Sequence, residues 1–296
     1  VVLTTFRSGE KDRPTDWRDG ADLYKTWAVK QPWCKRTYAQ RSDIPAWLKT
    51  GPAMVRFGRN WLANPDGIRE WLREYWLKRF PSNTPLIVAY WGWEKVESWV
   101  TPDYFPVFPS DEAFTALAKE TRRLGCHTFL WPSGYHYTLT YGAKGDGIFQ
   151  WDDRELFDRV AKPHAVQQRD GSPYRGARSW LQGGETSALC PGDPWTIDWL
   201  NDIAVQLCKR GADMIQVDQV VGGALYWCYS TRHKHPPGPG PWMTNAFRTQ
   251  LQTMLRACRA VDRDAVVCFE EPNELFIQEV AIQDYRDFEI LRRGSP

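Results

Sequence analysis

The sequence predicts an α/β fold with a parallel sheet, of the (β/α)8 TIM-barrel type. Short apolar runs rich in β-branched residues alternate five times with segments of helical period. Polar and aromatic residues gather after each predicted strand, where α/β barrels place their chemistry. A doubly wound sheet would show the same alternation, but no glycine-rich phosphate loop follows the first strand.

The predicted elements follow one another with recognisable boundaries. Strands are expected at residues 53–58, 85–93, 127–132, 213–218 and 265–270, with residues 288–291 as a candidate start of a sixth. Helices are expected at 66–79, from Ser110 to Gly125, from Asp193 to Gly211, around Phe247–Cys258, and briefly at 274–281. Because a complete barrel has eight strands, we expect this one to be incomplete at its C-terminal end.

The chain divides into two predicted parts. Residues 1–50 lack clear periodicity, apart from an amphipathic stretch near 21–29, and we interpret them as an entry segment or the remnant of an upstream domain. Residues 51–296 form the predicted barrel domain, with a long excursion at 133–192.

The composition excludes some classes of partner and favours another. A net charge of +2 with scattered arginines gives no reason to expect nucleic acid or an anionic membrane, and no run of residues is apolar and long enough to span a bilayer. The chain carries 17 tryptophans, and a tryptophan face stacks well on the apolar face of a sugar ring. The expected partner is therefore an oligo- or polysaccharide.

The seven cysteines include no CxxC pair and form no disulfide framework. Cys228, His233 and His235 form a C-x4-H-x-H run that resembles part of a zinc site, with Cys190 as a residue that could come near in space. Contact of His233 or His235 with substrate is the preferred interpretation. We therefore predict no metal and no cofactor.

Two strands end in carboxylates. Asp218 follows the run Met214–Val217, and Glu270 follows Val266–Phe269. Because the tips of neighbouring parallel strands lie on one edge of a sheet, the two carboxylates suggest the pair that cleaves glycosidic bonds. Asp213, at the start of its strand, is interpreted as structural.

Further residues near the strand tips are candidates for substrate binding. Adjacent strand residues point to opposite faces, so Glu270 and Glu271 are not expected to share one site without a bulge. The candidates for contact with substrate are Trp91, Trp93, Trp131, His136, Gln219, His233, His235, Glu271 and Glu274.

These motifs resemble the retaining (β/α)8 glycoside hydrolases, in which a strand ending in Asp precedes a strand ending in Glu. The likeness is to the α-amylase clan, to the endo-α-N-acetylgalactosaminidases, and to a bacterial family close to them. It is seen in Leu189–Trp195, Gln216–Gln219, His233–Gly238 and Phe269–Glu274. The resemblance implies that Asp218 is a nucleophile and Glu270 a general acid/base. The third acidic residue of those families has no counterpart here.

The sequence thus predicts a retaining glycoside hydrolase. The alternatives are a non-catalytic carbohydrate-binding barrel, which keeps the aromatic platform without a working carboxylate pair, and a zinc-dependent hydrolase that uses the loop with Cys228, His233 and His235.

Overall fold

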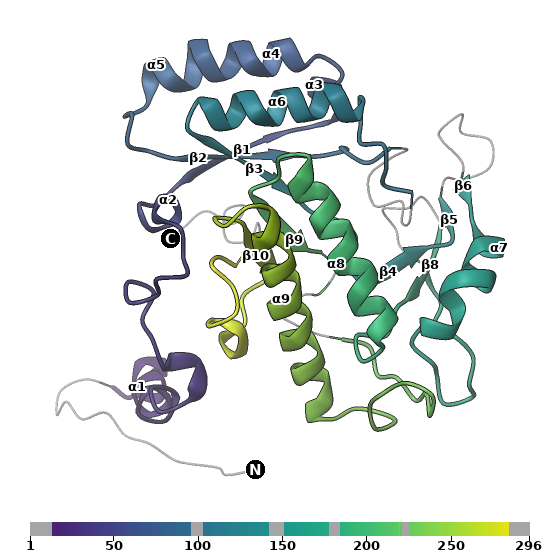
Figure 1. Ribbon diagram of the computed structural model, residues 1–296. Coiled ribbons are helices and arrows are strands. Elements are labelled where there is room, and N and C mark those ends of the chain that lie inside the picture. The colour runs from purple at the N-terminus through teal and green to yellow at the C-terminus, as the bar shows by residue number, and fades with distance from the viewer. Residues whose placement is uncertain are drawn as a thin grey trace.

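A five-stranded parallel sheet forms the centre of the molecule (Figure 1). The computed structural model describes residues 14–95, 103–141, 151–177, 184–218, 220 and 225–283. The strands are β1 (Ala53–Phe57), β2 (Leu86–Tyr90), β3 (Cys126–Leu130), β9 (Met214–Val217) and β10 (Val266–Phe269). All five predicted strands are therefore present, and each end lies within three residues of its predicted position.

The strand order is β1-β2-β3-β9-β10, and every neighbouring pair is parallel. Each new strand is added on the same side of the sheet, without the reversal that defines a doubly wound fold. The sheet is therefore singly wound, as an arc of a barrel is, and the described residues do not close it into a complete barrel.

The long helices cover one face of this sheet. They are α4 (Pro65–Glu70), which continues through a π-helical stretch (Trp71–Trp76) into α5 (Leu77–Arg79), then α6 (Asp111–Arg123), α8 (Pro194–Lys209) and α9 (Pro241–Val261). Figure 1 shows α4 and α6 over β1 to β3, and α8 beside α9. Their buried side chains form the main core together with alternate strand residues such as Val88, Ile215 and Val267.

The opposite face of the sheet is covered differently. Its strand residues include Met214, Val266 and Cys268, which pack on Leu48 of the short helix α2 (Ala46–Lys49) and on Ile44. The same cluster includes Trp47 of α2, Trp91 after β2 and Trp131 after β3.

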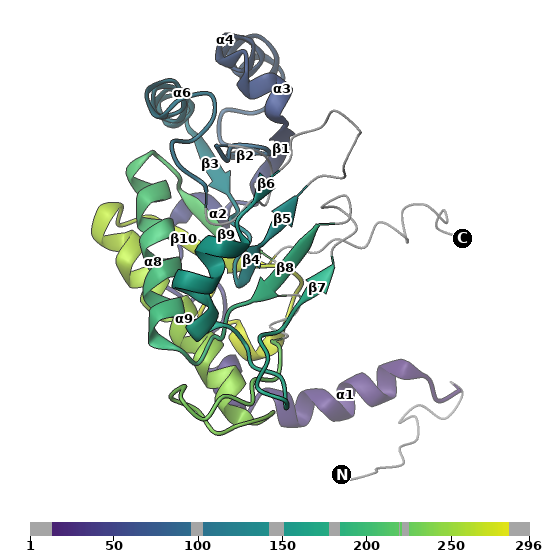
Figure 2. The same cartoon turned by 90° about the vertical axis from the view of Figure 1, so that its right-hand side faces the viewer.

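The excursion after β3 builds a small sheet of its own (Figure 2). Its antiparallel order is β4-β8-β7, and β5 pairs with β6 beside it. The elements are β4 (His136–Thr138), β5 (Thr140–Tyr141), β6 (Trp151–Asp152), α7 (Arg154–Leu156), a π-helical stretch (Phe157–Ala161), a 3-10 helix (Lys162–His164), β7 (Gly176–Ala177) and β8 (Glu185–Ala188).

The segment before β1 forms α1 (Trp17–Ala28) and a 3-10 helix (Pro32–Cys34). The short helix α3 (Arg59–Leu62) follows β1. In the segment before β1, the buried Arg41 donates hydrogen bonds to the carbonyl oxygens of Ile277 and Val280, both at 2.6 Å, and pairs with Asp43. This segment is thus attached to the chain that follows β10.

Two predictions about the end of the chain have different outcomes. The helix expected at 274–281 is only one 3-10 turn, Glu274–Phe276, which Asn273 caps by accepting a hydrogen bond from Leu275 N. The strand expected at 288–291 lies outside the described residues. Among the described residues, no helix combines the length and apolar character needed to cross a membrane.

Candidate active site

Asp218 and Glu270 occupy adjacent positions at the C-terminal edge of the sheet. In the pairing of β9 with β10, Val217 is opposite Phe269, so the next residue on each strand is Asp218 or Glu270. Neighbouring strands lie about 4.8 Å apart, and residues in register point to the same face. The two carboxylate-bearing residues therefore follow two adjacent strands at the same level.

The alternation of side chains fixes the face on which this pair lies. Val217 and Phe269 belong to the helix-covered core, whereas Met214 and Cys268 belong to the opposite face. Because successive residues of a strand alternate, the positions after Val217 and Phe269 belong to the face without long helices.

Asp218 is held by the segment that follows β3. Its backbone N–H donates to the carbonyl oxygen of Pro132 at 3.3 Å, and the residue is 4% exposed. Gly134, with φ +59°, approaches so closely that an added Cβ would lie 2.3 Å from the Asp218 carbonyl oxygen. The close passage of two backbones thus positions Asp218.

Glu270 is half-buried at the point where β10 ends. The next residue, Glu271, has φ 62°, which is uncommon for a residue other than glycine. This left-handed residue turns the chain away from the strand, so Glu271 does not continue the strand geometry of Glu270. Such backbone outliers are often found near functional sites.

Two tryptophans follow strands on the same face as the carboxylates. Trp131 and Trp91 pack with the residues of that face, and their rings meet edge to face at 4.9 Å and 70°. The guanidinium of Arg56, on β1, lies 4.6 Å from the centroid of the Trp91 ring. Trp91 is half-buried, whereas Trp131 is 7% exposed.

The structure places Trp93 away from this face. Gly92 has φ +74°, which breaks the alternation directly after Trp91 and turns the next side chain toward the helices. Trp93 is fully buried in the main core and stacks on Tyr104 at 5.4 Å and 15°. Its ring is therefore not available as a platform for a ligand.

The other predicted binding residues are dispersed. His136 is buried in β4 and meets Tyr226 edge to face at 5.5 Å. Glu274 is exposed and accepts a hydrogen bond from Tyr24, which raises the pKa of this tyrosine to about 12. Gln219 lies outside the described residues.

A cavity of about 570 Å³ lies beside the small sheet. Tyr174 and Tyr226 line it and contact each other at 4.2 Å. Since Tyr226 also contacts His136, this histidine lies behind the cavity wall. The remaining lining residues are Gln168, Arg169, Asp170, Leu225, Trp227 and Tyr229.

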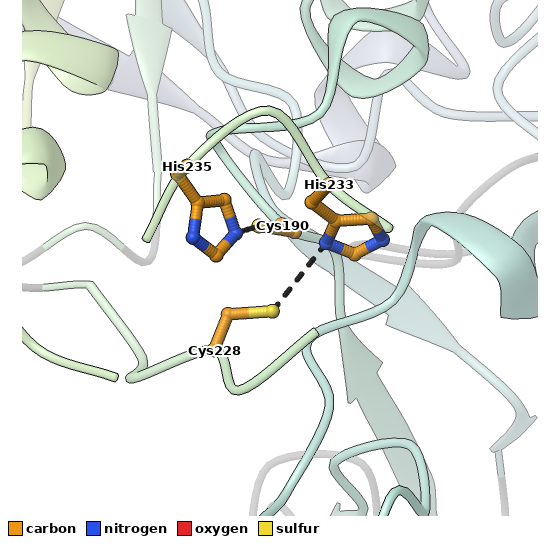
Figure 3. Close-up of side chains that lie close together, drawn as sticks. All are labelled: Cys190, Cys228, His233 and His235. Carbon is orange, nitrogen blue, oxygen red and sulfur yellow. Dashed lines mark hydrogen bonds between the residues drawn. The ribbon is translucent and has the colours of Figure 1, made fainter. Parts of the chain in front are cut away.

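His233 and His235 are brought together with two cysteines (Figure 3). The ligand atoms of Cys190, Cys228, His233 and His235 all lie within 4.8 Å of one another. Spacing along the sequence indicated three of these residues, and only the fold brings Cys190 to them. The two histidines thus face the sulfur atoms of this cluster.

The chain is thus an α/β protein with a singly wound parallel sheet, and two carboxylate-bearing residues follow adjacent strands at the C-terminal edge of this sheet. The chain belongs to the family DUF6259, described as a domain of unknown function, which it matches over residues 9–294. A Bacteroides thetaiotaomicron protein named "Putative glycoside hydrolase" is 24% identical over 240 residues, which is 80% of this chain and 32% of that protein.

Solved structures share the fold. The ligand-free α-N-acetylgalactosaminidase NagBb from Bifidobacterium bifidum matches with a TM-score of 0.67 and 15% identity, over 95% of this chain and 46% of that one. The cycloalternan-forming enzyme from Listeria monocytogenes, with a pentasaccharide substrate, matches with a TM-score of 0.51 and 14% identity, over 79% and 22%. The chain therefore spans less than half the length of each of these relatives.

Proposed function

We propose that this chain carries the catalytic carboxylates of a retaining glycoside hydrolase, and that its sheet is an arc of a (β/α)8 barrel. The observation that carries the proposal is the register of β9 and β10, which sets Asp218 and Glu270 on adjacent strands at one level. Retaining glycosidases hold their two carboxyl groups about 5–5.5 Å apart, close to the spacing of neighbouring strands.

In this proposal Asp218 attacks the anomeric carbon and displaces the leaving oxygen. Glu270 gives its proton to that oxygen as the bond to the sugar breaks. Water then attacks the glycosyl-aspartate ester, Glu270 takes up a proton from this water, and Asp218 is released as carboxylate. Two inversions give a product with the anomeric configuration of the substrate.

The surroundings of the pair support a sugar as substrate. Trp91 and Trp131 lie on the same face, and aromatic faces stack on the apolar face of a sugar ring. The names of the Bacteroides, Bifidobacterium and Listeria relatives describe a glycoside hydrolase, an α-N-acetylgalactosaminidase and a cycloalternan-forming enzyme. An aryl α-N-acetylgalactosaminide is therefore the first member of the panel of aryl glycosides that we would assay.

The test is chemical rescue of each carboxylate variant. Asp218→Ala should lower turnover at least about 10³-fold, and added azide should then yield the glycosyl azide of inverted configuration. Glu270→Ala with azide should yield the azide of retained configuration, because the nucleophile remains. NMR spectroscopy of the products distinguishes the two outcomes.

Asp264→Asn is the matched control, because Asp264 precedes β10 at the opposite end and its side chain is 64% exposed. It should hydrolyse the substrate at the rate of the unaltered protein. Sugar binding without turnover by the unaltered chain would instead indicate a non-catalytic carbohydrate-binding protein. An inverted product from the unaltered protein would reject the roles given to Asp218 and Glu270.

A further inference from the structure

We propose that Cys190, Cys228, His233 and His235 bind a structural zinc ion. Zinc with tetrahedral Cys2His2 ligation has bonds of 2.3 Å to sulfur and about 2.0–2.1 Å to nitrogen, so its ligand atoms lie roughly 3.3–3.8 Å apart. The Cys190 Sγ to His235 Nε2 distance is 3.1 Å, and the Cys228 Sγ to His233 Nδ1 distance is 3.4 Å. All four atoms lie within 4.8 Å of one another.

Each histidine has its second nitrogen engaged outside the cluster. His233 Nε2 lies 2.9 Å from the carbonyl oxygen of Pro163, and His235 Nδ1 lies 2.8 Å from that of Pro236. Because a carbonyl only accepts, these two nitrogens must carry the hydrogens. The lone pairs of His233 Nδ1 and His235 Nε2 are left to face the sulfur atoms, as in metal sites where a carbonyl orients the ligand.

The sulfur atoms receive backbone hydrogen bonds. Gln167 N–H donates to Cys228 Sγ at 3.4 Å, and the N–H groups of Ser230 and Gly192 face Cys228 and Cys190 respectively. Such donors stabilise negative charge on sulfur, and the thiolate is the form of cysteine that binds metal. The imidazole lone pairs thus face the centre of the cluster, and backbone N–H groups around it donate to the sulfur atoms.

Packing holds His235 in a single orientation. Its ring stacks on Trp242 at 3.7 Å and 8°. A Cβ added to Gly192 would lie 2.4 Å from His235 Cδ2 and 3.0 Å from Trp242 Cζ3. The glycine directly after Cys190-Pro191 therefore leaves the space that the ligand ring occupies.

The ligand set indicates a structural ion rather than a catalytic one. Four protein ligands complete a tetrahedron, whereas catalytic zinc keeps one position open for water. Both cysteines are fully buried, and His233 is 9% exposed. Two sulfur and two imidazole ligands favour zinc over magnesium or calcium, which prefer oxygen.

The ion would crosslink two parts of the chain near the cavity. Cys190 lies between β8 and α8, and the other three ligands lie in residues 225–240, which contain no helix or strand. Tyr226 and Trp227, directly before Cys228, line the cavity. The zinc would hold that wall in place, and this inference does not depend on the proposed hydrolysis.

Metal analysis of the reduced chain, purified without a polyhistidine tag, tests the proposal directly. Inductively coupled plasma mass spectrometry should find about one zinc ion per chain. Cobalt, added after zinc is removed with a chelator, should give thiolate-to-cobalt charge-transfer and tetrahedral d–d bands. Azide should leave these bands unchanged, because no exchangeable position is open; a shift would show that the site is open and overturn the structural role.

Variants assign the site to its residues. Cys228→Ser and His235→Gln should lose the zinc, whereas Cys34→Ser, an exposed cysteine, and His164→Gln, beside Pro163, should keep it. Cys228→His retains a ligand and should still bind metal, which separates loss of zinc from loss of fold. Equal zinc in Cys228→Ser and Cys34→Ser would overturn the proposal. So would a folded, metal-free chain that gives no cobalt spectrum, or one with a Cys190–Cys228 disulfide.

Discussion

Gly134 lies against the backbone of Asp218, in a contact that leaves no room for a side chain. A Cβ at position 134 would meet the Asp218 carbonyl oxygen at 2.3 Å and Val217 Cγ1 at 3.2 Å. Gly134 also has φ +59°, where residues with a side chain are strained. The segment after β3 therefore determines where the tip of β9 can lie.

Gly134→Ala should accordingly displace Asp218 and lower kcat/KM about 100-fold, since a shift of about 1 Å in a catalytic group can cost that much. The matched control is Gly125→Ala. Gly125 precedes β3 with φ +75° but has no atom within 4 Å of an added Cβ, so it carries the same kind of strain without the collision. Steady-state kinetics of both variants measure the effect. Equal activities would show that the contact does not position Asp218.

The strands could be predicted from the sequence, and so could the two carboxylates at their tips. Apolar runs such as Val266–Phe269 end at Glu270, and this pattern alone locates the C-terminal edge of the sheet. The strand order shows that the sheet is singly wound. This order could not be predicted from the separate strand patterns, because it depends on contacts between segments that are distant in the sequence.

Trp93 illustrates why the binding residues were harder to predict. Trp91 and Trp93 are two residues apart, so a continuous strand would place both on one face. Gly92 adopts φ +74°, and a Cβ there would lie 2.8 Å from Arg59 Cβ. A single backbone angle, set by a tertiary contact, thus sends Trp93 into the core. Cys190 lies 38 positions before Cys228, so the sequence indicates it only as a residue that could come near, and the fold brings it into the cluster.

Trp91→Ala should raise KM about 10-fold with little change in kcat, because losing a stacking contact costs about 1–1.5 kcal/mol in binding. Trp91 is half-buried beside Trp131, on the face that carries the carboxylate pair. Trp17→Ala is the control, because Trp17 is 72% exposed on α1. A KM unchanged by Trp91→Ala would exclude this ring from the substrate site.

Asp213 has a structural role that is separable from the role proposed for Asp218. Its carboxylate accepts a hydrogen bond from Thr128 N at 2.7 Å and pairs with Arg122, at the junction of β3 and β9. Asp213→Ala would leave the buried Thr128 N–H without this acceptor, which should lower the free energy of unfolding by about 2–3 kcal/mol. Urea denaturation measures it. Asp262→Ala, which removes a second partner of Arg122 and an exposed hydrogen bond from Asp264 N, should cost less.

His127 should make stability depend on pH in a window that can be specified. Burial is the main cause that lowers its pKa to about 4, and the charge of Arg122 adds to the effect. Its ring stacks on Trp47 at 3.8 Å and 12°. The unfolded chain, where the pKa is about 6.5, takes up the proton first. The contribution of His127 to the free energy of unfolding is therefore fully present above about pH 6.5, and it is lost as the pH drops to about 4.

The His127→Gln variant isolates this contribution from the carboxylates that titrate in the same range. The difference in unfolding free energy between the unaltered protein and the variant should change by at most about 1.4 kcal/mol per pH unit within the window, and should level off on either side. Urea titrations of both proteins at a series of pH values measure it. A difference that stays constant from about pH 6.5 to about pH 4 would mean that His127 is protonated as readily in the folded chain as in the unfolded one. The stack on Trp47 of α2 would then not disfavour the charged form of the ring.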